Sequence, residues 1–328
     1  MITGEGGIGI LGMGKYLPKR VIDNSQIASW TGISAQEIEQ KIGVKTRCLG
    51  EDSDKGSDYA LQASKQAMER AGVSAESLRF IVSCSFTNDY HFPAMSCKIQ
   101  AELKAWNAGA FDILANCTSF QVGLATAVEK MAFDSSIDTS LVVATALQSR
   151  YIDWHDPETA MYFGDGAGAT VLGRVPAGYG FLSNAIMTNG RVYDAVRRQG
   201  DGTAADFSDE RRKYIEMNGM EVWKQVIQWQ PRVIRRALEK AGLTEQDVDF
   251  FIFHQANLNL VKYLIGKMRL PMDKTYTTVE KYGNTADASL AITLCEAVEQ
   301  EKIKRDDIVV VSGVGAGFIF GASVMKWY

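Results

Sequence analysis

The stretch that decides the fold is AFDILANCTSFQVGLATAVEK, residues 110–130. It opens with an apolar run at 111–115 that predicts a strand, and it continues after Cys117 with apolar residues at helical spacing. A cysteine therefore stands where a buried strand passes into a buried helix. The N–H groups at a helix N-terminus favour a thiolate and can hold an oxyanion, so we expect a nucleophilic Cys117 with a lowered thiol pKa. A buried cysteine that only packs in the core is the alternative interpretation.

The composition is that of a globular protein with one large domain or two of ordinary size. The chain has 328 residues, 46% of them hydrophobic and 23% charged, and a formal net charge of -4. It has no basic stripe and no apolar run of the roughly 18 residues that a membrane helix needs, so we expect neither nucleic acid nor a membrane as a partner. The five cysteines are scattered without a CxxC pair, which is typical of reduced thiols in a cytoplasmic protein. No HExxH spacing is present, and we expect no metal site.

Two segments repeat one pattern at an offset of 170 residues. Residues 67–82, AMERAGVSAESLRFIV, and 237–252, ALEKAGLTEQDVDFFI, each predict a helix ending in Ala-Gly, a polar link and an apolar strand. Gly72 and Gly242 stand where a helix C-cap takes a positive φ. We therefore expect an α/β fold built from two pseudo-equivalent halves, residues 1–175 and 176–328.

Other segments add detail to this plan. The apolar, β-branched runs 140–146 and 308–313 predict strands buried on both faces. The polar and charged residues 192–212 predict a surface excursion within the second half.

The repeat also relates two polar residues to Cys117. Position 84 maps to His254, which ends a strand in FIFHQAN, and Asn284 in YGNTAD precedes the helix that matches the Cys117 helix. We therefore expect Cys117 and Asn284 at pseudo-equivalent helix starts, with Cys117, His254 and Asn284 meeting at the centre of the molecule. Taken alone, His254 is equally compatible with a hydrogen-bonded core histidine, and Asn284 with a turn residue or a helix N-cap.

Three glycine patterns need an interpretation. Residues 7–12, GIGILG, fit GxGxxG, but no strand precedes them and no helix opens from them, so a nucleotide site is not expected. Residues 313–318, GVGAGF, follow a strong strand and predict a tight loop whose backbone comes close to the site. In residues 163–168, FGDGAG, we expect a turn in which Asp165 accepts hydrogen bonds from backbone N–H groups.

The chain resembles β-ketoacyl-acyl-carrier-protein synthase III and its thiolase-fold relatives over almost its whole length. The motifs that carry the resemblance are residues 12–18 (GMGKYLP), 91–93 (HFP), 112–123 around Cys117, 163–168 (FGDGAG), 254–257 (HQAN), 282–285 (YGNT) and 315–318 (GAGF). The resemblance implies a five-layered αβαβα fold, a homodimer and a catalytic set of Cys117, His254 and Asn284. It also implies an oxyanion hole formed by the backbone N–H groups of Cys117 and Gly317.

The activity implied by the resemblance is that of a condensing acyltransferase. Cys117 takes an acyl group from a coenzyme A or acyl-carrier-protein thioester, with no further cofactor. His254 and Asn284 then stabilise the enolate left by decarboxylation of a malonyl thioester, and a β-ketoacyl product for fatty-acid or polyketide biosynthesis results. Two other functions stay open: acyl transfer to a hydroxyl or amine acceptor with His254 as general base, and a non-catalytic subunit of a heteromeric synthase. Such a subunit would be expected to lose its reactive residues.

The expected donor-binding surface departs from the family pattern. Glu37 stands where the family has a tryptophan that stacks on the adenine of coenzyme A, and Lys41 and Asn259 each replace an arginine, while Arg47 keeps a nearby basic position. The resemblance therefore implies a specialised member whose donor is carried on carrier protein or is an unusual coenzyme A ester. The candidate substrate-binding residues are Lys41, Arg47, Asn257, Asn259 and Phe318.

Residues beside the nucleophile bear on the acyl pocket. Asn116, Thr118 and Ser119 are more polar than the small residues typical of the family, and we expect them to tune that pocket. Its depth depends on the packing of residues 86–92 and 192–212.

Overall fold

The computed structural model describes residues 6–328, and two sheets organise its fold. The first sheet has the strand order β1-β7-β6-β4-β5 and the second the order β11-β12-β13-β8. The first consists of β1 (Gly7–Tyr16), β4 (Phe80–Cys84), β5 (Gly109–Ile113), β6 (Ser140–Ala146) and β7 (Gly166–Val175); the second consists of β8 (Gly180–Thr188), β11 (Phe250–Phe253), β12 (Ile308–Gly315) and β13 (Ile319–Lys326). β4 pairs in parallel with β5 and β6, β11 pairs in parallel with β12, and the other neighbours are antiparallel.

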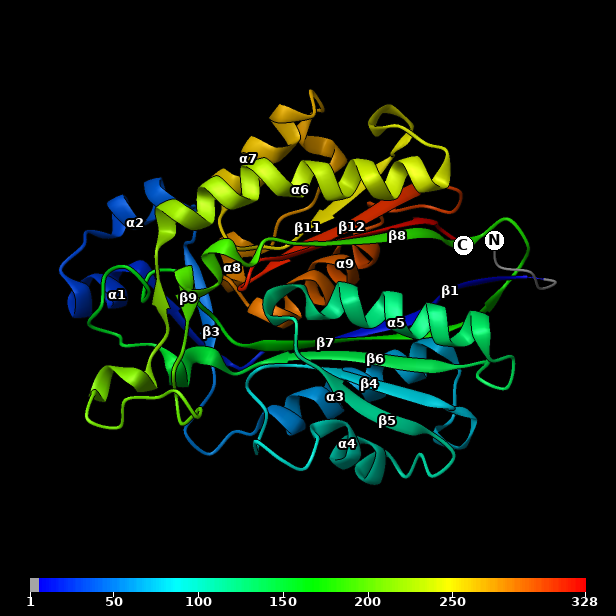
Figure 1. The fold of residues 1–328 in the computed structure, drawn as a ribbon, viewed down its shortest axis with the longest axis horizontal. Helices are drawn as coiled ribbons and strands as arrows, with labels where there is room; N and C mark the ends of the chain where they lie inside the picture. The colour runs from blue at the N-terminus through cyan, green and yellow to red at the C-terminus, as the bar shows by residue number, and fades with distance from the viewer. Residues whose placement is uncertain (1–5) are drawn as a thin grey trace.

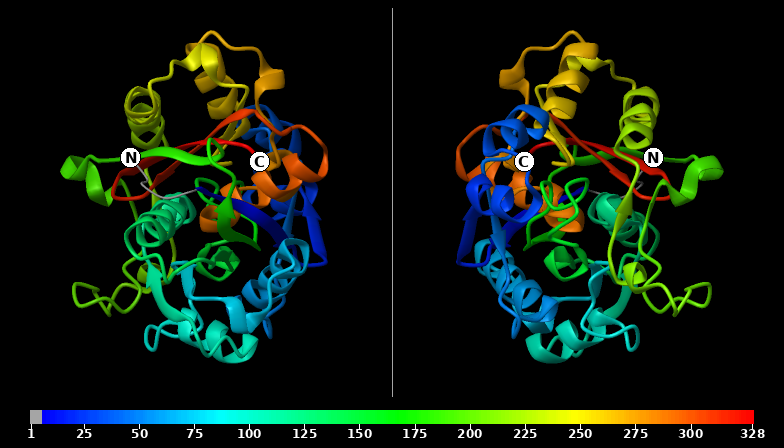
Figure 2. Two further views of the ribbon diagram at one scale, coloured as in Figure 1. Left: turned by 90° about the vertical axis from the view of Figure 1, so that its right-hand side faces the viewer. Right: turned by 90° about the vertical axis from the view of Figure 1, so that its left-hand side faces the viewer.

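Helices form the three remaining layers. The helices that lie between the sheets are α5 (Ser119–Phe133) and α9 (Ser289–Glu299); those on the outer face of the first sheet are α3 (Gly56–Ala71) and α4 (Met95–Leu103); those on the outer face of the second are α6 (Gly219–Ala241) and α7 (Leu258–Lys267). Figure 1 shows this stacking from α6 and α7 at the top to α4 at the bottom, and Figure 2 shows it from both ends of the molecule. The predicted five-layered αβαβα arrangement is confirmed.

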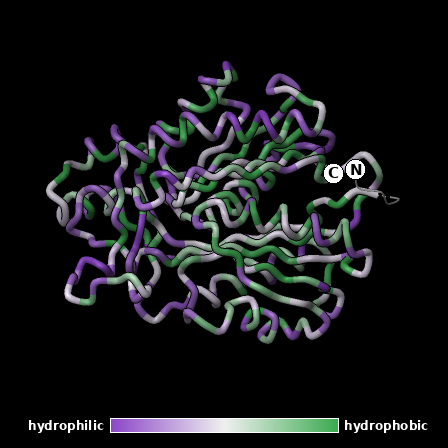
Figure 3. The backbone as a smooth tube through the Cα atoms, viewed as in Figure 1, coloured by the Kyte–Doolittle hydropathy of each residue, from purple (hydrophilic) through white to green (hydrophobic). Residues whose placement is uncertain are grey.

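Hydrophobic patterning explains the layers. α5 and α9 each contact both sheets and are therefore apolar on nearly all sides, with Phe120, Leu124, Leu290 and Leu294 fully buried. Figure 3 shows hydrophobic colour along the strands and central helices and hydrophilic colour along the outer helices and loops. The outer helices α3 and α6 end at glycines with positive φ, as the repeat predicts.

Smaller elements complete the chain on the side where the catalytic candidates lie. They are β2 (Arg20–Asp23), α1 (Asn24–Thr31), α2 (Ala35–Ile42), β3 (Thr46–Leu49), α8 (Val279–Tyr282), β9 (Val196–Arg197), β10 (Glu216–Met217), and the 3-10 turns η2 (Asn116–Thr118) and η8 (Ala286–Ala288). Residues 192–212 lie largely on the surface as predicted, but Val196 of β9 also packs inward and lines the cavities described below. Residues 7–12 belong to strand β1 and form no phosphate-binding loop.

The two-fold relation between the halves corrects one expectation. The turns η2 and η8 are 170 residues apart and precede the equivalent helices α5 and α9, and both carry a residue with positive φ, Asn116 (48°) and Ala286 (40°). The counterpart of Cys117 is therefore Asp287. The expectation that Asn284 occupies that position is wrong, because Asn284 lies before η8, at the position that matches Leu114 before η2.

Within residues 6–328, no helix combines the length and the apolar character needed to cross a bilayer.

Candidate active site

Cys117 lies in the turn η2, between β5 and α5. The left-handed Asn116 precedes it, and the Asn116 side-chain amide donates to the carbonyl of Ala316 (3.1 Å) in the loop after β12. Gly315 permits this close approach, because a Cβ at that position would lie 2.2 Å from the carbonyl oxygen of Ala115. The predicted tight loop at 313–318 is confirmed only in part: residues 313–315 belong to β12, and residues 316–318 form the loop, which lies against the turn that carries Cys117.

Two backbone N–H groups at this junction have no acceptor. Within the described residues, the N–H groups of Cys117 and Gly317 donate to no other residue. Ala316 and Gly317 line a cavity together with Cys117. Free N–H groups beside a nucleophile are what an oxyanion requires.

One cavity brings the three catalytic candidates together. Cys117, His254 and Asn284 all line a cavity of about 100 Å³ whose other walls are mostly apolar. The apolar walls come from the start of α6, from α7 and from the loop after β12, and include Met217, Val222, Trp223, Leu260 and Phe318. The cavity is a narrow, largely apolar space with three polar side chains at one point.

His254 follows β11 and is held by Ser289 at the start of α9. The imidazole Nδ1 lies 2.5 Å from the Ser289 hydroxyl, which also accepts a hydrogen bond from the backbone N–H of Gln255 (3.4 Å). Burial lowers the pKa of His254 to about 3, so the ring is neutral at physiological pH. If the Ser289 hydroxyl donates to Nδ1, the proton of the neutral ring sits on Nε2, which can then donate to a substrate. Ser289 carries no sequence motif and was not predicted.

Replacing Ser289 by alanine tests this orientation. We expect Ser289→Ala to lower the rate of the His254-dependent step about tenfold, corresponding to about 1.4 kcal/mol, because the ring loses the partner that fixes its tautomer. Single-turnover kinetics measure the loss. Ser289→Thr keeps the hydroxyl and serves as the control, and equal losses in both variants would contradict the proposed orientation.

Asn284 is fixed so that its amide nitrogen stays free. Its Oδ1 accepts a hydrogen bond from the backbone N–H of Ala286 (2.9 Å), while its own backbone N–H donates to the carbonyl of Tyr162 (2.8 Å). Since Oδ1 is already bound to a donor, Nδ2 is the group left to reach a ligand in the cavity. His254 and Asn284 thus can both act as hydrogen-bond donors.

The expected lowering of the Cys117 thiol pKa is wrong. Burial raises the pKa well above its ordinary value, and the negative charge of Asp287 raises it further; the backbone N–H of Cys117 acts in the opposite direction but is weaker. Cys117 is half-buried, and the desolvation that its surroundings impose on the thiolate is not visible in the sequence. The resting site therefore holds a neutral thiol and a neutral imidazole.

Asp287 is the second residue that sequence reasoning missed. It is fully buried, its Oδ2 accepts from the backbone N–H of Phe86 (3.1 Å), the Ser119 side chain hydrogen-bonds to it, and its Oδ1 has no partner among the described residues. Burial raises the pKa of Asp287 from 3.8 to about 7. A carboxyl group that changes charge near neutral pH thus lies close to the nucleophile.

The raised pKa makes the stability of the protein depend on pH. Between pH 4 and 7 the unfolded chain has lost the Asp287 proton while the folded chain still holds it, so each pH unit of that interval costs about 1.4 kcal/mol of folding free energy at most. Asp287→Asn has no charge to bury. We expect its stability advantage over the parent to grow from pH 5 to pH 8, measured by denaturant unfolding. A pH-independent difference would contradict the burial of a titrating carboxyl group.

Asp165 has the structural role predicted for it. Its carboxylate accepts hydrogen bonds from the backbone N–H groups of Gly50 (2.8 Å) and Ser149 (3.0 Å) and from the Ser149 hydroxyl (2.5 Å). These bonds hold the segment before β7 against the end of β3.

Arg47 requires a correction. It was expected to offer a basic position to the donor, but it is fully buried, and its guanidinium donates to Asn24 Oδ1 (2.8 Å) and to the carbonyl of Met161 (2.6 Å). It holds β3 against neighbouring segments and does not face solvent. A basic residue in sequence does not reveal which way its side chain is directed.

The other candidate substrate-binding residues lie in two places. Asn257 caps α7 by accepting from the N–H groups of Asn259 and Leu260, and Asn257 and Phe318 line the catalytic cavity. Lys41 and Asn259 lie outside it: Lys41 pairs with Glu37 (2.8 Å), and the Asn259 amide donates to the carbonyls of Gln40 and Lys41. The structure thus brings two of the five to the catalytic candidates.

Known proteins match the chain along most of its length. A family described as 3-oxoacyl-[acyl-carrier-protein (ACP)] synthase III matches residues 111–190, and one describing the C-terminal part of that enzyme matches residues 238–327. A β-ketoacyl-[acyl-carrier-protein] synthase III of Geobacillus kaustophilus is 38% identical over 326 residues, covering 98% of this chain and 99% of the relative. One from Bacillus pumilus is 38% identical over 319 residues, covering 97% and 98%.

Solved structures agree with the sequence relatives. The 3-oxoacyl-[acyl-carrier-protein] synthase III of Aquifex aeolicus superposes with a TM-score of 0.91 at 32% identity and covers 98% of this chain and 100% of its own. The priming β-ketosynthase of the R1128 polyketide biosynthetic pathway gives a TM-score of 0.92 at 29% identity, with 98% and 97% covered. The resemblance read from the sequence motifs is confirmed.

Proposed function

Since the chain belongs to the 3-oxoacyl-[acyl-carrier-protein] synthase III family of condensing acyltransferases, we propose that Cys117, His254 and Asn284 carry out a decarboxylative condensation of two thioesters. The observation that carries the proposal is the single cavity that these three side chains line. We assign Cys117 to the half formed by residues 1–175 and the other two to the half formed by residues 176–328.

The first step loads the acyl group. The Cys117 sulfur attacks the carbonyl carbon of the donor thioester, and the free N–H groups of Cys117 and Gly317 hold the resulting oxyanion. Because the resting thiol is protonated, its proton must leave as the carbon–sulfur bond forms. The departing thiolate of the donor takes up this proton and leaves as a free thiol; His254 does not accept it, because its Nε2 already carries the ring proton and its Nδ1 is bound to Ser289.

The second step forms the carbon–carbon bond. A malonyl thioester loses its carboxylate as carbon dioxide, and the electron pair becomes an enolate whose oxygen receives hydrogen bonds from His254 Nε2 and Asn284 Nδ2. A neutral histidine suits this role, because it donates without a full proton transfer that would consume the enolate. The enolate carbon attacks the acyl group on Cys117, and the Cys117 thiolate leaves and takes up a proton from solvent, since its original proton departed with the donor thiol.

Release of carbon dioxide tests this reaction against its alternative. When an acyl thioester and a malonyl thioester are supplied together, we expect one molecule of carbon dioxide to be released for each β-ketoacyl product. Acyl transfer to a hydroxyl or amine acceptor gives an ester or amide and no carbon dioxide. The free Asn284 amide favours condensation. Together with His254 it gives two hydrogen-bond donors to one carbonyl oxygen, which an enolate needs and a simple acyl transfer does not.

The donor-recognition surface supports a specialised donor. Glu37 lies 2.8 Å from Lys41 and offsets its charge, and Asn259 is uncharged with its amide bound to backbone carbonyls, so these positions present no net positive charge to the phosphates of coenzyme A. We propose that the acyl group arrives on acyl carrier protein or as an unusual coenzyme A ester, to a cytoplasmic homodimer of the kind implied by the resemblance. Efficient loading of Cys117 by acetyl-coenzyme A alone, read by intact mass, would overturn this proposal.

A further inference from the structure

Two cavities meet at Cys117. Both are lined by Cys117, Phe163, Val196 and Ala316, but only the first contains His254 and Asn284. Under the proposed function, the extender carbonyl must lie between His254 and Asn284, and the first cavity is therefore taken by the extender and its thioester arm. The second cavity, of about 360 Å³, is the space left for the acyl chain on Cys117.

The walls of this second cavity, which we name the acyl cavity, are unusually polar for an alkyl chain. Its apolar members are Phe86, Leu114, Phe163, Val196 and Ile215. Gln148, Asn116 and two arginines stand among them. Asn116 is occupied by the carbonyl of Ala316, so the groups with unused hydrogen-bonding capacity must be sought in Gln148 and the arginines.

Gln148 has a fixed amide with an unused oxygen. The residue is fully buried, and its Nε2 donates to the carbonyls of Gly164 (3.1 Å) and Asn284 (2.6 Å). A flipped amide would turn its oxygen toward both carbonyls, so these two contacts fix the orientation. Its Oε1 is buried without a partner among the described residues. The Gln148 side chain exposes no surface to the cavity, so this oxygen lies beyond the reach of an acyl chain, and the residue serves to hold the backbone beside Asn284.

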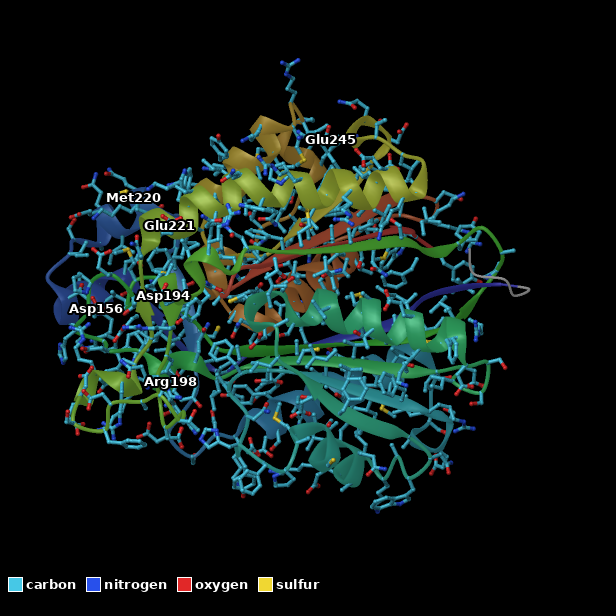
Figure 4. All side chains as sticks on the ribbon, viewed as in Figure 1. Asp156, Asp194, Arg198, Met220, Glu221 and Glu245 are labelled. Atoms are coloured by element: carbon cyan, nitrogen blue, oxygen red, sulfur yellow. The ribbon has the colours of Figure 1, made fainter. Side chains whose placement is uncertain are left out.

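Arg198 presents a cation without a carboxylate partner. Its Nε donates to the carbonyl of Lys213 (2.7 Å), and its guanidinium lies 3.8 Å from the centre of the Tyr151 ring. These contacts hold the guanidinium in place, while no carboxylate of the described chain lies within 4.0 Å of it. The neighbouring Arg197, by contrast, pairs with Glu216 (2.9 Å). Figure 4 labels Arg198 on the segment that follows β9, at the lower left of the view.

We propose that the acyl group accepted by Cys117 is a dicarboxylic acyl group whose free carboxylate binds Arg198. The carboxylate then stands at the end of the acyl chain remote from Cys117, because Arg198 lies on the outer segment of the cavity wall. A guanidinium with free N–H groups is suited to a carboxylate. This inference rests on the proposed function, because it assigns the acyl chain to this cavity.

A matched panel of five-carbon donors tests the proposal. Pentanoyl, 3-hydroxypentanoyl, glutaryl and 3-hydroxyglutaryl groups are supplied as pantetheine thioesters, so that recognition of coenzyme A or carrier protein plays no part. The rate of acyl addition to Cys117 is followed by intact mass without any extender. We expect the terminal carboxylate to raise the loading rate about tenfold, as for one well-placed ion pair, and the 3-hydroxyl group to leave the loading rate nearly unchanged.

A variant tests the Arg198 contact. In Arg198→Met the ratio of glutaryl to pentanoyl loading should fall to one or below. The ratio is measured within one variant, so a general loss of activity does not affect it. Arg211→Met, which replaces an exposed arginine of the same segment that does not line the cavity, is the control and should keep the ratio of the parent protein.

Two results overturn the inference in different ways. Loading of the pentanoyl group by the parent protein at a rate equal to or above that of the glutaryl group, or an unchanged ratio in Arg198→Met, would refute a dicarboxylic acyl group and leave the condensation mechanism standing. Failure of all four thioesters to load, with Cys117 still alkylated by iodoacetamide, would refute the proposed function itself.

Discussion

Replacing Cys117 by alanine is expected to abolish the covalent acyl-enzyme and to lower turnover by at least about a thousand-fold, since the reaction loses its nucleophile. The free N–H groups of Cys117 and Gly317 stay in place in this variant, and any residual rate would come from them. Intact mass after incubation with an acyl donor measures the adduct, and product formation measures turnover.

The chain offers a matched control for this experiment. Cys97, on α4, is exposed and lies outside both cavities. Cys97→Ala should keep the adduct and the rate, whereas an adduct that survives in Cys117→Ala and disappears in Cys97→Ala would place the nucleophile elsewhere. Because exposed thiols react with many thioesters, the comparison also separates enzymatic from chemical acylation.

Replacing Asn284 by aspartate is expected to stop condensation while leaving acyl loading nearly intact. The aspartate keeps an oxygen for the backbone N–H of Ala286, but it loses the Nδ2 donor that the enolate needs and adds a negative charge beside it. Loss of one such donor costs about a hundred- to a thousand-fold in rate. Asn284→Ala should lose a similar factor, although it also releases the N–H of Ala286.

The two half-reactions serve as internal controls for Asn284. Acylation of Cys117 is read by intact mass, and condensation by carbon dioxide release from labelled malonyl thioester. Equal losses in both steps would show that the variant disturbs the cavity as a whole. An unchanged release of carbon dioxide would remove Asn284 from the decarboxylation step.

The layered fold could be predicted from the sequence because it follows from local signals. Each of these signals depends on a few neighbouring residues: the Ala-Gly helix ends at Gly72 and Gly242, and the fully apolar strands. The 170-residue repeat shows the same signals in both halves, so each half supports the interpretation of the other. The repeat also predicted that Cys117 and His254 would meet, since both lie at strand ends facing the pseudo-two-fold axis.

The details that the sequence did not predict depend on contacts between distant segments. Ser289 matters because its hydroxyl reaches His254, and Gln148 because its amide is fixed by Gly164 and Asn284; neither contact leaves a local pattern. The pairing of Cys117 with Asp287 is different, because it follows from the 170-residue offset alone; the motif at residues 282–285 directed the comparison to Asn284 instead.

Burial explains the two chemical errors. The Cys117 thiol pKa is raised and not lowered, because removal of the thiolate from water outweighs the effect of the helix amides. Arg47 is enclosed by protein, where its guanidinium binds Asn24 and a backbone carbonyl. In both cases the residue type was identified correctly and its solvent environment was not.

The most direct test of the account is one single-turnover experiment on the parent protein. The protein is first acylated, the adduct is mapped to the peptide that contains Cys117, and a malonyl thioester is then added. We predict that the adduct mass disappears in step with the release of one carbon dioxide and one β-ketoacyl product per site. An adduct on a different residue, or an adduct on Cys117 that leaves only by hydrolysis, would contradict it.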